Sequence, residues 1–134
     1  VIGSSGTGKS CAIAYLVSFL RQPFLWLSGT AARQAHCDSA TADNGDSLHE
    51  TWRRMHTVPL LVIDDISQCK FTEAWGSALF SLMEARTSAR LPTLWTCQIS
   101  LPELRAKIGE QTGDTAQADA ISRRLAQHAL VITL

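Results

Sequence analysis

Several features that would place this chain in other protein classes are missing from its sequence. No apolar run approaches the roughly 20 residues that a membrane-spanning helix needs, and no segment has the order of a secretory signal. The cysteines form no CxxC pair, unlike those of a zinc ribbon, and are too sparse for a small disulfide scaffold; they are Cys11, Cys37, Cys69 and Cys97. We therefore expect a cytoplasmic chain with reduced thiols and no contact with a membrane.

An excess of charge of either sign is also missing. The chain has 12 basic and 12 acidic residues and a formal net charge of zero. No global field would attract nucleic acid or an anionic membrane, although a local basic patch is not excluded. A metal-ligand spacing is missing too, because His36, Cys37, His49 and His56 match no such pattern, and solvated side chains are the simpler interpretation.

The residues that are present predict one α/β domain. The chain has 134 residues, of which 46% are hydrophobic, and it opens on the apolar pair Val1-Ile2 without an initiator Met, as expected of a fragment that begins in a strand. Strand-length and helix-length patterns alternate, which predicts a parallel sheet with right-handed crossovers. We expect strands at 1–2, 24–27, 59–63, 94–97 and 130–134 and loops at 36–47 and 109–115. We expect helices at 10–20, 47–55, 72–86 and 116–127, and one that begins at residue 102. The first of these helices should be buried against the sheet, and Ser47 and Thr72 should cap the second and the third.

The most specific motif lies at the N-terminus, where residues 3–10 read GSSGTGKS and match G-x-x-x-x-G-K-[ST] in full. In such a loop the backbone N–H groups cradle phosphates, the Lys neutralises the β and γ oxygens and the Ser hydroxyl ligates Mg²⁺. The motif follows a strand end and precedes a helix, as this chemistry requires. We predict an ATP-binding site with Mg²⁺ as cofactor, formed by Gly3, Ser4, Ser5, Gly6, Thr7, Gly8, Lys9, Ser10 and Cys11.

Acidic and amide side chains follow two later strands. Asp64 and Asp65 come after a continuous aliphatic run, and Gln98 closes the strand that contains Thr96. The carboxyl ends of parallel strands share one edge of a sheet, where ligands bind. We predict that Asp64 holds the Mg²⁺ shell with Ser10, that Asp65 polarises the attacking water and that Gln98 contacts that water or the γ-phosphate, a role that Thr96 could share.

Two clusters of basic residues have an ordinary explanation beside a functional one. Arg123 and Arg124 lie on a late helix, where arginines are usually solvated but where an arginine could also reach the γ-phosphate of a neighbouring subunit. Trp52 precedes Arg53 and Arg54 and could stack on single-stranded nucleic acid, although packing into the core is the simpler interpretation. The other three tryptophans lie in apolar strands or on an apolar helical stripe and predict core packing.

Four blocks together resemble AAA+ ATPases, and most nearly the DnaC/IstB-type clade of helicase loaders and transposition helper ATPases. They are GSSGTGKS at 3–10, IDDI at 63–66, TLWTCQISLPEL at 93–104 and AISRRL at 120–125, and the resemblance covers nearly the whole chain. It implies a P-loop NTPase fold, a three-layer α/β/α sandwich with a mostly parallel sheet. It also implies that residues 1–134 are an AAA+ core truncated at both ends, without an N-terminal partner domain or the C-terminal sensor-2 region.

Position by position, the resemblance implies roles for single residues. Asp64 and Asp65 take the place of the second acidic motif, and Gln98 stands at the sensor-1 position, where the family usually has Asn. Arg124 matches the arginine finger that acts in trans, with Arg123 as the alternative. The implied partners are further copies of the chain, a replicative helicase, an initiator or a transposase, and single-stranded DNA.

Two other functions remain open at this point. A small-molecule P-loop kinase would share the loop, but it needs an arginine-rich lid that the stretch between Asp65 and Arg123 does not suggest. An ATP-gated interaction module with little turnover would fit Asp65 in place of Glu and Gln98 in place of Asn. The leading prediction is Mg-dependent ATP hydrolysis by an AAA+ module.

Overall fold

The structure, a computed structural model, describes residues 1–41, 48–127 and 130–134. Its centre is a parallel sheet in the order β1-β2-β3, formed by Phe24–Ser28, Leu60–Asp64 and Thr93–Trp95. The register aligns Ser28 with Asp64 across β1 and β2, and Ile63 with Trp95 across β2 and β3. Beyond β3 the sheet continues through Ile2, which forms parallel bridges with Cys97 and Thr133.

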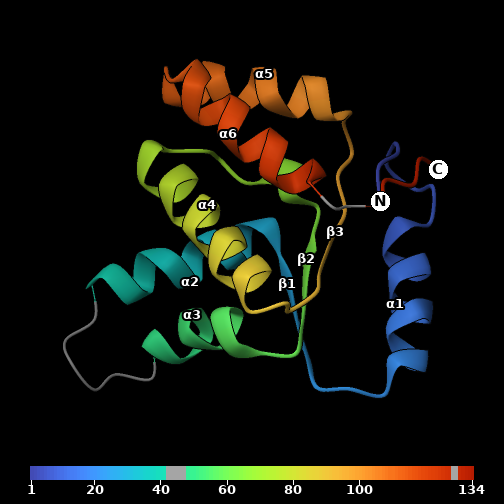
Figure 1. The fold of residues 1–134 in the computed structure, drawn as a ribbon. Coiled ribbons are helices and arrows are strands. Elements are labelled where there is room, and N and C mark those ends of the chain that lie inside the picture. The colour runs from blue at the N-terminus through green and yellow to red at the C-terminus, as the bar shows by residue number, and fades with distance from the viewer. Residues whose placement is uncertain (42–47, 128–129) are drawn as a thin grey trace.

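The helices lie on both faces of this sheet and give three layers (Figure 1). Helix α1 lies on one face, and the remaining helices lie on the other side of the strands or at their carboxyl ends. They are α1 Lys9–Leu20, α2 Gly29–Thr41, α3 Leu48–Thr57, the 3₁₀ turn η1 Ile66–Gln68, α4 Glu73–Ser88, α5 Leu101–Thr112 and α6 Thr115–Ala126. The expected α/β/α sandwich with parallel strands is confirmed.

Strand β2 is the centre of the core because it is covered on both faces. Leu60 and Val62 pack with Ile13 and Val17 of α1, whereas Leu61 and Ile63 belong to the larger cluster on the opposite face. All four β2 residues are at most 1% exposed. A continuous aliphatic run without alternation is what such a position requires.

The capping residues fix where the later helices begin. Thr72 accepts a hydrogen bond from the Trp75 N–H and is the N-cap of α4, as predicted. Ser100 and Glu103 form a capping box at the start of α5, and Asp114 caps α6. The predicted cap at Ser47 lies outside the described residues.

Two predicted loops are shorter than expected. Residues 36–41 continue α2, because Ala32 and Ala35 bury a small apolar stripe that the polar composition of the segment had hidden. Residues 109–112 continue α5, which ends at Gly113 with a φ of 73°. Gly109 lies inside that helix, so the predicted loop began at the wrong glycine. Within the described residues at the C-terminus, the expected strand 130–134 is reduced to a bridge at Thr133.

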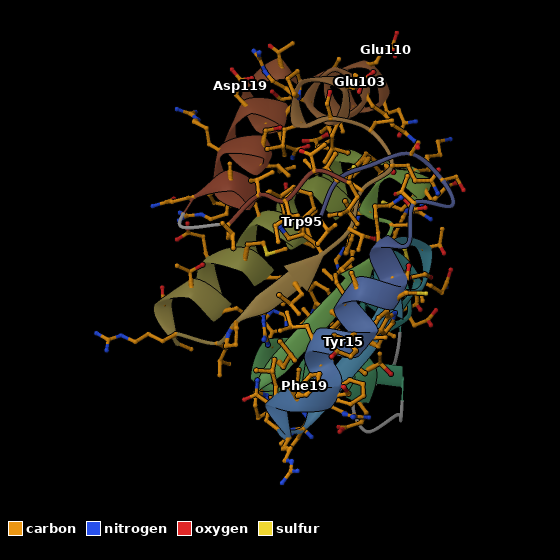
Figure 2. All side chains as sticks on the ribbon, turned by 90° about the vertical axis from the view of Figure 1, so that its right-hand side faces the viewer. Tyr15, Phe19, Trp95, Glu103, Glu110 and Asp119 are labelled. Atoms are coloured by element: carbon orange, nitrogen blue, oxygen red, sulfur yellow. The ribbon has the colours of Figure 1, made fainter. Side chains whose placement is uncertain are left out.

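Helix α1 is less buried than its composition predicts. Ile13 and Val17 face the sheet, but Tyr15 is 70% exposed and Phe19 is 64% exposed. Figure 2 shows both rings on the α1 ribbon, and their centroids lie 4.8 Å apart in an edge-to-face pair. The helix packs against the sheet as predicted, but only one of its faces meets the strands although its composition is apolar almost all round. Across the three described stretches of chain, no helix is long and apolar enough to cross a membrane.

A buried arginine ties the edges of two strands to α3. Arg86 on α4 is 1% exposed and donates to the carbonyls of Met55, Val58 and Pro92 at 2.7–3.0 Å and to the Thr93 hydroxyl at 2.9 Å. Burial lowers the pKa of its guanidinium to about 10, so it still carries a charge at neutral pH. It thereby satisfies three backbone acceptors next to β2 and β3.

We expect Arg86→Met to destabilise the protein by about 3 kcal/mol or more, because it removes the guanidinium that donates to the buried Met55 and Val58 carbonyls. Urea unfolding of the full-length protein, followed by tryptophan fluorescence, measures the change. Arg54→Met is the matched control, since Arg54 is an exposed arginine on α3, and its effect should stay within about 0.5 kcal/mol. Equal midpoints for both variants would contradict a stabilising role for Arg86.

Candidate functional site

The glycine-rich loop joins Ile2 to α1 and has the conformation that a phosphate cradle needs. Gly6 and Gly8 have φ values of 81° and 85°, which residues with a side chain rarely adopt, and Gly8 is the N-cap of α1. Residues 4–8 are exposed, so their backbone N–H groups are accessible to a ligand. The positive end of the α1 dipole lies at this loop and favours an anion there.

Lys9 is the buried cation of the loop. It is 7% exposed, and its Nζ donates to the Ser4 carbonyl at 2.6 Å. The Thr7 hydroxyl donates to the same carbonyl at 3.0 Å. The ammonium thus folds back across the loop to the Ser4 carbonyl, and phosphate oxygens bound within the loop could accept from its other N–H groups.

Ser10 and Asp64 meet at the carboxyl edge of the sheet. The Ser10 hydroxyl lies 2.9 Å from each carboxylate oxygen of Asp64 although 54 residues separate them. The Thr96 hydroxyl donates to Asp64 Oδ1 at 2.6 Å and so fixes that carboxylate from the side of β3. An exposed hydroxyl beside a carboxylate is an oxygen donor set of the kind that Mg²⁺ prefers.

Asp65 occupies a constrained turn. Its φ of 54° and ψ of 62° are left-handed, and its N–H donates to the buried Thr96 hydroxyl at 2.7 Å. Both carboxylate oxygens have partners: Ser67 Oγ donates to Oδ1 at 2.7 Å, and Gln98 Nε2 donates to Oδ2. The structure thus brings Asp65 and Gln98 together, as expected of strand-end residues.

Gly29, the first residue of α2, packs closely against the backbone of this turn. A Cβ at Gly29 would lie 2.7 Å from the Asp65 carbonyl oxygen and 2.9 Å from the Ile66 Cα. Only a glycine therefore allows the start of α2 to approach the backbone of the acidic turn so closely. The sequence signals for Gly29, Thr96 and Ser67 are weak, because single small residues match no motif. The available signal was their position at or shortly after the ends of strands.

The two arginines of α6 differ in their surroundings. Arg124 pairs with Glu84 of α4, has its guanidinium carbon 5.6 Å from the centre of the Phe80 ring, and donates to Gln127 Oε1 at 2.6 Å. The Arg123 side chain is exposed and donates to the Asp119 carbonyl at 3.3 Å. In the described structure neither arginine hydrogen-bonds to the glycine-rich loop or to the acidic pair.

Trp52 is part of the core rather than an exposed stacking platform. Its ring centroid lies 5.0 Å from that of His36, 4.8 Å from that of His56 and 6.3 Å from that of Trp75. Burial, followed by the charge of Arg33, lowers the pKa of His36 in this group. Arg53 forms a bidentate pair with Glu50. The simpler interpretation therefore holds for Trp52, which packs with other aromatic rings, whereas Arg53 and Arg54 are exposed on α3.

A comparison with protein families decides the assignment. The model of the IstB-like ATP-binding proteins matches residues 1–134, the whole chain. The chain belongs to the IstB-like ATP-binding family. It is an AAA+ P-loop protein of the DnaC/IstB type, and ATP is its nucleotide. No match was found among proteins with curated descriptions.

Solved structures agree with this fold. The chain is similar to DnaI, with a TM-score of 0.75, 18% identity and coverage of 98% of this chain and 70% of that chain. It is similar to the DnaC helicase loader, with a TM-score of 0.71, 15% identity and coverage of 99% of this chain and 75% of that chain. It is also similar to the replication initiator DnaA bound to AMPPCP and single-stranded DNA, with a TM-score of 0.69 and 17% identity. That match covers 99% of this chain and 39% of that chain. The chain thus spans well under half of that initiator's length, and at these identities the likeness concerns the fold.

We expect Lys9→Ala to weaken ATP binding by about 10–100-fold, because it removes a charge-assisted contact to the phosphates. Equilibrium titration of the full-length protein with a fluorescent ATP analogue measures this. Lys70→Ala removes an exposed lysine of equal charge and should leave the affinity unchanged. Equal affinities for the two variants would argue against nucleotide binding in this loop.

We expect Gly29→Ala to destabilise the fold by about 1–3 kcal/mol, because its Cβ collides with the backbone of the acidic turn. Gly109→Ala is the matched control: its Cβ would meet Ala118 and Thr115 at an ordinary 3.7 Å, and alanine favours the helix. Thermal unfolding of both variants tests the contrast. A neutral Gly29→Ala would show that α2 does not support the turn.

Proposed function

We propose that this domain hydrolyses ATP with Mg²⁺ and acts on DNA as a helicase loader or a transposition helper. The observation that carries the proposal is the convergence of Lys9, Ser10, Asp64, Asp65 and Gln98 at one edge of the sheet, from three separate segments. Phosphate binding, metal ligation and water activation each have a candidate residue there.

In this proposal each side chain has one task. Backbone N–H groups of the loop and Lys9 bind the β- and γ-phosphates. Ser10 and Asp64 would hold Mg²⁺, which supplies charge neutralisation of the phosphate oxygens when bound. The Asp65 carboxylate accepts a hydrogen bond from the attacking water, and the second amide proton of Gln98 Nε2 would donate to that water or to the γ-phosphate.

The remaining charge of the transition state would be met by an arginine from a second copy of the chain. Arg124 is the proposed finger, which requires that Glu84 release its guanidinium on assembly. Arg123 is the alternative, and its exposure supports it without such a release. In either case residues 1–134 form the AAA+ core of a homo-oligomer whose further partners are a helicase, an initiator or a transposase.

A second candidate is an ATP-gated assembly switch with little turnover. It is favoured by the two hydrogen bonds that already engage the Asp65 carboxylate, from Ser67 and Gln98. Such engagement would compete with the attacking water. The two candidates differ in turnover, not in ATP binding.

Turnover by the full-length protein, with and without single-stranded DNA, tests the proposal. We expect hydrolysis that single-stranded DNA stimulates, and that Arg124→Ala lowers by at least about a hundredfold while ATP affinity is kept. If Arg123→Ala alone has this effect, the finger is Arg123. ATP binding and oligomerisation without turnover would reject hydrolysis in favour of the assembly switch.

A DNA contact through α3 is tested in the same assay. Arg53→Ala/Arg54→Ala should abolish the stimulation and flatten the salt dependence of single-strand binding if these residues contact phosphates. Unchanged stimulation would place the DNA surface elsewhere on the assembly.

A further inference from the structure

Ser67 is a buried polar residue to which no motif assigns a role. It lies in η1, two residues after Asp65, and is 4% exposed. Its hydroxyl donates to Asp65 Oδ1 at 2.7 Å and accepts the Gln98 backbone N–H at 3.2 Å. Its carbonyl accepts from Lys107 of α5. Ser67 therefore contacts both the acid and the amide residue of the proposed site.

The direction of these hydrogen bonds is fixed by chemistry. An ionised carboxylate only accepts, so the single hydroxyl proton of Ser67 must point to Asp65. A backbone N–H only donates, so the Gln98 amide occupies a lone pair of the same oxygen. The hydroxyl is thus oriented from two sides, and Asp65 Oδ1 is held relative to the strand end at residue 98.

The backbone of the turn does not depend on this hydroxyl. The Ile66 N–H donates to the Thr96 carbonyl at 3.0 Å, the Gln68 N–H to the Asp65 carbonyl at 3.1 Å, and the Asp65 N–H to the Thr96 hydroxyl. These bonds persist if residue 67 loses its oxygen. What changes is the rotational freedom of the Asp65 carboxylate, which would keep Gln98 as its remaining side-chain partner.

We propose that Ser67 is a positioning residue for ATP hydrolysis: its hydroxyl holds the Asp65 carboxylate at a fixed distance from Gln98 and directs its remaining lone pairs toward the attacking water. The inference rests on the proposed hydrolytic function. Because the hydrogen bonds of Ser67 in the described structure go to Asp65, Gln98 and Lys107 and not to the glycine-rich loop, its effect falls on the rate of hydrolysis and leaves nucleotide binding intact.

The test compares Ser67→Ala and Ser67→Thr in the full-length protein, with turnover, ATP affinity and thermal midpoint measured separately. We expect Ser67→Ala to lower kcat by about tenfold at an ATP affinity within about twofold of the parent. Ser67→Thr keeps the hydroxyl and should retain kcat within about threefold. The thermal midpoints of both variants should stay near that of the parent.

Several results would overturn the inference. They are an unchanged kcat in Ser67→Ala, a Ser67→Thr variant as slow as Ser67→Ala, and a loss of ATP affinity or folding in Ser67→Ala that accounts for the slower turnover. These leave the hydrolytic function of the parent in place. Absence of turnover in the parent itself would instead reject hydrolysis, and this inference with it.

Discussion

The hydroxyl of Thr96 connects the two acidic residues to the sheet, and the geometry of the whole site depends on it. It is fully buried, donates to Asp64 Oδ1 at 2.6 Å and accepts the Asp65 N–H at 2.7 Å. The register that pairs Ile63 with Trp95 places Thr96 directly beyond the end of β3, level with Asp64, the last residue of β2. A one-residue slip of this pairing would move the Thr96 hydroxyl away from Asp64 Oδ1 and from the Asp65 N–H.

Sequence reasoning found the parts of this site that chemistry constrains. The loop at residues 3–10 needs glycine, lysine and serine at fixed spacing, so it is readable without a structure. Asp64, Asp65 and Gln98 were found because parallel strands end at one edge, and the structure places them within hydrogen-bond contact of one another or of Ser10. The strands expected at 24–27, 59–63 and 94–97 were predicted from their apolar runs, with ends off by one or two residues, whereas the one expected at 130–134 is reduced to a bridge.

What sequence reasoning missed depends on tertiary contacts. The outer face of α1 looked buried because its composition is apolar, whereas the sheet is wide enough to cover only Ile13 and Val17. The first half of the loop expected at 36–47 is helical because alanines pack on the core, a contact that polar neighbours conceal. The contact of Gly29 with the acidic turn joins residues that are distant in the sequence and leaves no pattern in it.

The ion pair of Arg124 with Glu84 links the α4–α6 contact within one subunit to the proposed assembly of subunits. Inside one subunit it neutralises a half-buried carboxylate, and the guanidinium also covers the Phe80 ring. A neighbouring γ-phosphate carries more negative charge than Glu84 and accepts more hydrogen bonds, so it can compete for the same arginine. If Arg124 is the finger, breaking its ion pair with Glu84 costs free energy, and only a neighbouring subunit with bound nucleotide offsets that cost. Assembly would then depend on ATP because the Arg124 side chain exchanges Glu84 for the γ-phosphate, and the sheet would not need to move.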